Sequence, residues 1–160
     1  MDVEIRRATT EDGPALLDLW HGFTEHLSEY DERYQHKEDA DDRWLQYFEN
    51  QLVDSKYGAV FIAVAEDDIV GVIEARLTGD HPIFRLSDHG YINGHYVAES
   101  HRDQGVGDAL VEAAVEWFSE SDRDVTFCRV DVIEGDDQGR KAYERMGFSP
   151  VEHVYERQVD

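Results

Sequence analysis

A glycine-rich turn between an apolar strand and an amphipathic helix is the segment best suited to bind an anion. The turn spans residues 102–107 (Arg-Asp-Gln-Gly-Val-Gly), and its glycines lack a Cβ, so a ligand can lie directly on the backbone. Apolar residues at helical spacing continue to about Glu120, which predicts a helix. Because the first turn of a helix has unpaired N–H groups at the positive end of its dipole, we expect a phosphate or pyrophosphate there.

Two common nucleotide-binding patterns are excluded. A P-loop requires Gly-Lys followed by Ser or Thr, which this turn lacks. A dinucleotide fingerprint requires a third glycine at the helix start, where this chain has Leu110. A Gly-x-Gly pair alone also occurs in turns that merely begin a helix, so the neighbouring residues decide its meaning.

The neighbouring residues form two family-like motifs. The segment from Val97 to Gly107 resembles the acyl-CoA-binding motif of the GCN5-related N-acetyltransferases (GNAT), written Arg/Gln-x-x-Gly-x-Gly/Ala. Downstream, the segment from Tyr143 to Phe148 is similar to the Tyr-x-x-x-Gly-Phe signature of the same family. The two motifs stand in the expected order and spacing, and the resemblance covers nearly the whole chain.

The resemblance implies a fold and a reaction. The expected fold is α/β (α+β), one GNAT-like domain over residues 1–160, with a mixed, mostly antiparallel sheet of six or seven strands and about four helices. Its central strands are expected to splay apart and admit the acyl-pantetheine arm. The implied reaction is transfer of the acetyl group from acetyl-CoA, the co-substrate, to an amine by direct attack in a ternary complex.

Family resemblance also assigns the co-substrate contacts and one catalytic group. Tyr143 takes the place of the general acid for the CoA sulfur, and a main-chain N–H near Val97 that of the oxyanion donor. Asp103 and Asp108 stand where basic or small residues are usual, and Asp136 where asparagine is usual. The expected cofactor-binding residues are Val97, Ala98, Glu99, Arg102, Asp103, Gln104, Gly105, Val106, Gly107, Asp136 and Tyr143.

The general base is left open by the sequence. A primary amine has a pKa near ~10 and is almost wholly protonated at pH 7, so it must lose a proton before it attacks. Asp131, His95 and Glu74 are the candidates, and a water relay is a further option. Tyr91 and Asn93 occupy positions where relatives place a base, and neither is a natural base.

Two other functions are compatible with the motifs. A non-catalytic acyl-CoA-binding sensor would keep the glycine turn without needing Tyr143 or a base. A peptide or protein N-terminal acetyltransferase would take a peptide amine in place of a small-molecule amine, and Asp131 is the residue that hints at it.

The amino-acid composition limits the kinds of molecule that this protein is expected to bind. The formal net charge is −22, with 37 acidic and 15 basic residues, which disfavours nucleic acid. Such acidity could attract a cationic substrate, but it is dispersed along the chain and not concentrated in a block, which favours a general surface property. The three lysines, Lys37, Lys56 and Lys141, and the dispersed acidity resemble proteins of halophilic archaea, whose concentrated salt screens self-repulsion. The eight histidines are scattered without a zinc-like spacing, so no metal is expected. A homodimer is possible because dimers are common in the family.

Location follows from what the sequence lacks. No apolar run approaches membrane-spanning length, so no membrane partner is expected, and Met1 to Glu4 lack a signal-peptide pattern. The single cysteine, Cys128, excludes an internal disulfide and is expected to be a buried, inert thiol. A cytoplasmic location is the default.

The hydrophobic pattern predicts the elements that position these residues. Strands and helices alternate along the chain, which by itself indicates α/β or α+β. The expected strands are 3–8, 57–65, 69–77, 91–97, 125–133 and 150–158. The expected helices run from a cap at 9–12 to about 27, from 40 to 51, from 106 to about 120, and from an opening at 134–137 to about 146.

Overall fold

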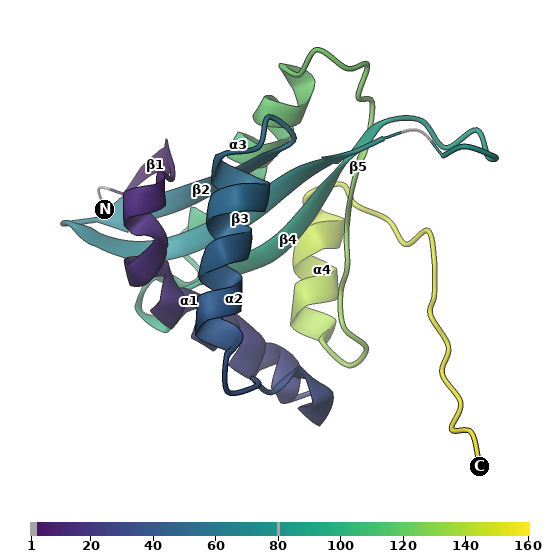
Figure 1. Cartoon of the computed structure of the whole chain (residues 1–160), viewed down its shortest axis with the longest axis horizontal. Coiled ribbons are helices and arrows are strands. Elements are labelled where there is room, and N and C mark those ends of the chain that lie inside the picture. Colours follow the sequence, from purple (N-terminus) through teal and green to yellow (C-terminus); the bar gives the residue numbers. More distant parts are fainter. Residues whose placement is uncertain (1–2, 80) are drawn as a thin grey trace.

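A computed structural model describes residues 3–79 and 81–160. These residues form one five-stranded sheet in the order β1-β2-β3-β4-β5 (Figure 1). The first four strands pair antiparallel, and β5 pairs parallel to β4. The strands are β1 (Glu4–Arg7), β2 (Gly58–Ala65), β3 (Asp68–Thr78), β4 (His89–Val97) and β5 (Cys128–Val130).

Helices cover both faces of the sheet. Helices α1 (Gly13–Ser28) and α2 (Ala40–Tyr47) lie on one face, and a π-helical turn over Phe48–Val53 extends α2. Helix α3 (Val106–Ser119) packs on the other face, and α4 (Asp137–Arg145) adds Tyr143 to that side of the core. None of the described helices has both the length and the apolar character needed to span a membrane.

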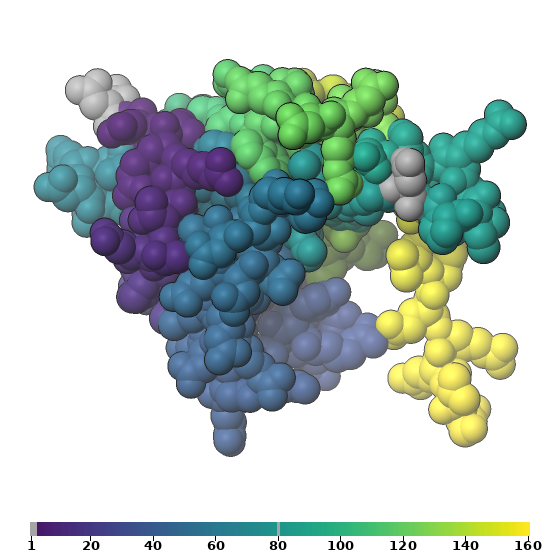
Figure 2. All heavy atoms as spheres, turned by 45° about the horizontal axis from the view of Figure 1, so that its top comes forward, coloured from purple at the N-terminus to yellow at the C-terminus, as the bar shows by residue number. Residues whose placement is uncertain are grey.

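The prediction of six or seven strands was wrong: the described residues form five. The strand expected at 125–133 is shortened to Cys128–Val130, and residues 150–158 form no strand although their side chains alternate. They leave the body as an extended segment (Figure 2). The side chain of Val154, in this segment, is 94% exposed. Alternation expresses strand propensity, whereas a strand also requires a neighbour for its hydrogen bonds, and 150–158 find none in the described chain.

A bulge in β4 changes which face its side chains occupy. The register with β3 passes from Glu74 opposite Asn93 to Val72 opposite Tyr96, so β4 carries one extra residue there. Gly94 has φ of +57°, a left-handed conformation that suits a bulge. Ile92 faces α3, whereas Tyr96 packs on the α1 side, so the bulge reverses the alternation and sends His95 towards α3.

We expect Gly94→Ala to destabilise the fold by at least ~2 kcal/mol, because two costs add. A Cβ at Gly94 would lie 2.0 Å from a carboxylate oxygen of Glu74, and the left-handed φ strains any L side chain. Denaturant unfolding measures the loss. Gly107→Ala is the control, since its Cβ would meet His95 at an ordinary 3.5 Å. Equal midpoints for the two variants would contradict the expectation.

Candidate active site

Strand β5 pairs with only the first part of β4. Their pairing runs from Gly90 opposite Cys128 to Ile92 opposite Val130. Beyond Ile92 the strand continues to Val97 with no described neighbour on that edge, as the splay implied by the family resemblance would require. His95 lies on this unpaired part of β4.

A hydrogen-bonded chain links His95 to both helices on the α3 face. The Gly107 carbonyl can only accept, so His95 donates to it from Nε2, at 3.1 Å. The remaining ring nitrogen, Nδ1, must then accept from the Tyr143 hydroxyl, at 2.8 Å. The hydroxyl of Tyr143 is therefore held in one place by a neutral imidazole that is itself anchored at the start of α3.

Burial disfavours the charged forms of both His95 and Tyr143. It lowers the pKa of His95 to about 4, although the Gly107 carbonyl and Asp108 act in the opposite direction. Burial also raises the pKa of the Tyr143 hydroxyl well above its ordinary value, and Asp136 adds to that effect. His95 is thus a neutral orienting group at pH 7 and a poor acceptor for an amine proton.

The second motif fixes the Tyr143 ring by packing. Gly147 has φ of +96° and ends the helical path just after α4. The chain turns there, and Phe148 meets the Tyr143 ring edge-on with ring centroids 5.5 Å apart. The glycine and the phenylalanine of the signature therefore position the tyrosine.

The glycine turn presents an open backbone at the start of α3. Gly105 is left-handed, with φ of +84°, and an added Cβ there would meet no atom within 4 Å. In the part of the chain that the structure describes, no backbone carbonyl accepts from the N–H groups of residues 104–108. Open space, unpaired N–H groups and the helix dipole fit a pyrophosphate.

Arg102 has a role that the motif did not predict. Its guanidinium folds back onto the end of β4, donating to the Val97 carbonyl at 3.0 Å and to the Tyr96 hydroxyl at 2.9 Å. Its charge also lies 5.2 Å from the centre of the Tyr96 ring. Arg102 therefore ties the glycine turn to the strand, which leaves anion contacts to the backbone of the turn.

Glu74 lies on the opposite face of the sheet, under α2. It is a rare buried carboxyl, 6% exposed, and lies against Gly94 of the bulge. Burial raises the pKa of Glu74 to about 7, while Arg76 and the Tyr47 hydroxyl hold it lower than burial alone would. The group therefore changes charge near neutral pH, the range in which a general base is useful.

The remaining candidates, as far as the structure describes them, form no hydrogen bond with His95 or Tyr143. Asp131 is exposed, and its carboxylate accepts from the Tyr91 hydroxyl at 2.5 Å. Asp136 caps α4 by accepting from the Gly139 N–H at 3.0 Å, and it pairs with His26 of α1 at the same distance. Cys128 is half-buried, and burial raises the pKa of its thiol, which agrees with an inert role.

Residues 97–99 complete the strand end as expected. Val97 is the last residue of β4, and the Ala98 N–H bonds to the Val70 carbonyl at 2.7 Å. Glu99 then begins a short 3₁₀ turn. Sequence reasoning missed the bulge at Gly94, although a glycine inside a strand is a recognised signal for one.

Known proteins share both sequence and architecture with this chain. The model of the acetyltransferase (GNAT) family matches residues 20–148. An aminoglycoside N(6')-acetyltransferase type 1 from Stenotrophomonas maltophilia is 35% identical over 121 residues, which cover 72% of this chain and 74% of that protein.

Solved structures agree on the fold. A mutant of the BH1408 protein from Bacillus halodurans superposes with a TM-score of 0.80 at 19% identity, covering 98% of this chain and 99% of that one. The aminoglycoside acetyltransferase AAC(6')-Iy, in complex with a bisubstrate analogue containing CoA, gives 0.73 at 19% identity, with 100% and 99% covered. The family model and the aminoglycoside acetyltransferase match, together with the two motifs, show that the chain belongs to the acetyltransferase (GNAT) family.

Proposed function

We propose that this protein transfers the acetyl group of acetyl-CoA to a primary amine of a small molecule by direct attack in a ternary complex. The observation that carries the proposal is the Tyr143 hydroxyl, held by His95 beside the splay and next to the open glycine turn. Backbone N–H groups of residues 104–108 would hold the pyrophosphate, and the pantetheine would enter between β4 and β5.

Glu74 supplies the base in this proposal. It lies on the face of the sheet opposite Tyr143, so the amine and the leaving sulfur can occupy opposite sides of the splay. A pKa of about 7 matches proton removal better than the pKa of about 4 for His95. Because Glu74 is buried, a water molecule is the natural carrier between the amine and the carboxylate.

The bond changes balance with these groups. The amine nitrogen bonds to the thioester carbon, its proton passes to Glu74, and the oxyanion is stabilised by a main-chain N–H near Val97. The C–S bond then breaks, and CoA leaves as a thiolate that takes its proton from solvent. A thiol has a pKa of ~8.5, so full proton transfer from Tyr143, whose pKa is raised, would be uphill. Tyr143 therefore acts on the sulfur chiefly as a hydrogen-bond donor, for which its single O–H must turn from Nδ1 of His95 to the sulfur.

The acceptor is proposed to be a cationic small-molecule amine. The relative from Stenotrophomonas maltophilia is an aminoglycoside acetyltransferase, which acts on a polyamine sugar. The formal net charge of −22 would draw a multiply charged amine towards this surface in dilute buffer. Peptide amines are the competing class of acceptor, against which the small-molecule amines are to be compared.

Tyr143→Phe tests the proposal. We expect kcat to fall by about 10²-fold while acetyl-CoA affinity stays within about twofold, because the sulfur and His95 lose a donor whereas the proposed pyrophosphate contacts are unchanged. Thiol release would be followed across aminoglycosides, simple amines and peptides, in dilute and in concentrated KCl. Tyr155→Phe is the matched control, since Tyr155 is 91% exposed in the C-terminal segment.

Three outcomes would overturn parts of the proposal. Acetyl-CoA binding without turnover on any acceptor would favour the non-catalytic sensor. Turnover on peptides alone would assign a peptide acceptor. A wild-type protein that binds no acetyl-CoA would exclude the role given to residues 104–108.

A further inference from the structure

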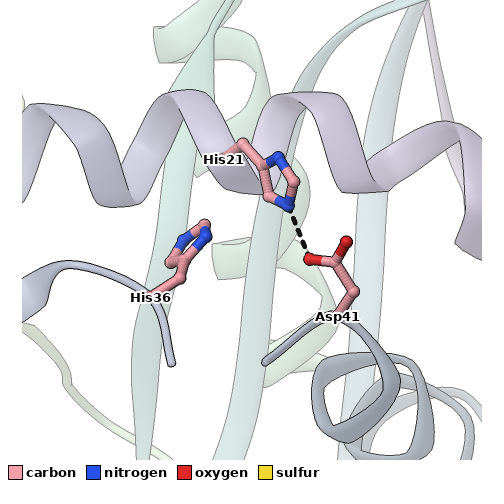
Figure 3. Close-up of side chains that lie close together, drawn as sticks. All are labelled: His21, His36 and Asp41. Atoms are coloured by element: carbon pink, nitrogen blue, oxygen red, sulfur yellow. Dashed lines mark hydrogen bonds and ion pairs between the residues drawn. The ribbon is translucent and has the colours of Figure 1, made fainter. Parts of the chain in front are cut away.

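Three metal-ligating side chains converge outside the proposed acetyl-transfer site. His21 comes from α1, Asp41 from α2, and His36 from the connection between them (Figure 3). One potential ligand atom from each lies within 4.8 Å of the other two. The spacing of these residues in the sequence does not predict the cluster, because only the fold brings the three segments together.

His21 and Asp41 are hydrogen-bonded to each other at the position where an ion would bind. The Nε2 atom of His21 lies 2.6 Å from Oδ1 of Asp41, and the carboxylate only accepts, so the imidazole donates (Figure 3). A divalent ion with ligand bonds of ~2.0–2.2 Å can replace that proton after the two atoms move apart by less than ~1 Å. In a neutral His21 that proton is then carried by Nδ1, so the ring binds the ion as a neutral imidazole.

His36 is prepared as a ligand by its other nitrogen. The Thr24 hydroxyl donates its proton to the His21 carbonyl at 3.1 Å, so it must accept from Nε2 of His36. The Nδ1 atom of His36 therefore carries a free lone pair. Trp20 stacks on the His36 ring, with centroids 4.5 Å apart and planes inclined by 7°. A second nitrogen engaged in this way is the usual support of a metal-bound histidine.

We propose that His21, His36 and Asp41 bind one divalent transition-metal ion of the zinc class. Two imidazoles and one carboxylate suit zinc or cobalt, whereas calcium and magnesium prefer oxygen ligands alone. The side chains of His21 and Asp41 are 38% and 50% exposed, so water can fill a fourth position. The ion would fasten α1 to α2 and hold the connection between them, independently of acetyl transfer.

Metal titration of the full-length protein tests this inference. Protein stripped with a chelator would be titrated with Zn²⁺ by calorimetry and with Co²⁺ by visible absorption, without acetyl-CoA. We expect one ion per chain, a Co²⁺ spectrum of four or five ligands, and no displacement by excess Mg²⁺. Thermal unfolding gives a second readout, in which Zn²⁺ raises the melting temperature of the wild type.

Variants locate the site. His36→Ala and Asp41→Asn should each weaken Zn²⁺ binding by at least ~100-fold and abolish the thermal shift, and Thr24→Val should weaken it by ~10-fold. His153→Gln, an exposed histidine elsewhere, should change neither. Circular dichroism would verify that each variant is folded. Retention of wild-type affinity in folded His36→Ala, or loss in His153→Gln, would overturn the proposal.

Discussion

Glu74→Gln is expected to lower kcat/KM by about 10²–10³-fold, the usual contribution of a general base. Glutamine keeps the shape of the side chain and its contact with Gly94 but cannot take a proton. In the wild type, kcat/KM should rise with pH through about 7, because Glu74 must be ionised to act. The rise through that pH should disappear in the variant.

The same substitution is expected to make the protein more stable at pH 8. Burial raises the pKa of Glu74 from 4.5 to about 7, so between these values the folded protein binds more protons than the unfolded chain. Stability therefore falls as pH rises from 4.5 to 7. Above pH 7 the cost of the buried charge is on the order of 3 kcal/mol at ~1.4 kcal/mol per pH unit, and glutamine removes most of it.

Activity profiles and denaturant unfolding from pH 5 to pH 9 measure both effects. Glu66→Gln, in the exposed turn between β2 and β3, is the matched control and should change neither quantity. Asp131→Asn separates the two carboxylate candidates. If that variant alone lost activity and Glu74→Gln kept it, the base would be Asp131.

A carboxylate at Gly105 is expected to weaken acetyl-CoA binding by about 100-fold or more. An added side chain there points into open space, and Asp and Asn both tolerate the left-handed conformation. Gly105→Asp and Gly105→Asn should therefore fold with a similar strain of ~1 kcal/mol. Only aspartate adds a negative charge where the pyrophosphate is proposed to lie, so its affinity loss should exceed that of asparagine about tenfold.

The salt dependence of acetyl-CoA affinity separates the effect of the added charge from the effect of the added volume in these two variants. Concentrated KCl screens the added carboxylate, so the gap between Gly105→Asp and Gly105→Asn should narrow as salt rises. Calorimetric titration with acetyl-CoA at several salt concentrations measures it. Identical affinities in dilute buffer would show that the pyrophosphate does not lie over Gly105.

Local patterns in the sequence determined much of the fold. The glycine turn, the helix after it and the strands β2 and β3 were all predicted, because each depends on neighbouring residues. The family followed from two short motifs for the same reason: each motif encodes a turn and a helix end that position the backbone. The functional roles of the residues in those motifs stay predictions.

Only the tertiary structure decided how distant residues meet. The bulge at Gly94 turns His95 towards Tyr143, whereas strict alternation would have sent it to the other face. Glu74 acquires its raised pKa from burial beneath α2. The strand predicted at 150–158 is absent because hydrogen-bonding partners, unlike side-chain alternation, are not written in the segment itself. Burial, register and pairing are properties of neighbours in space, which a linear pattern does not contain.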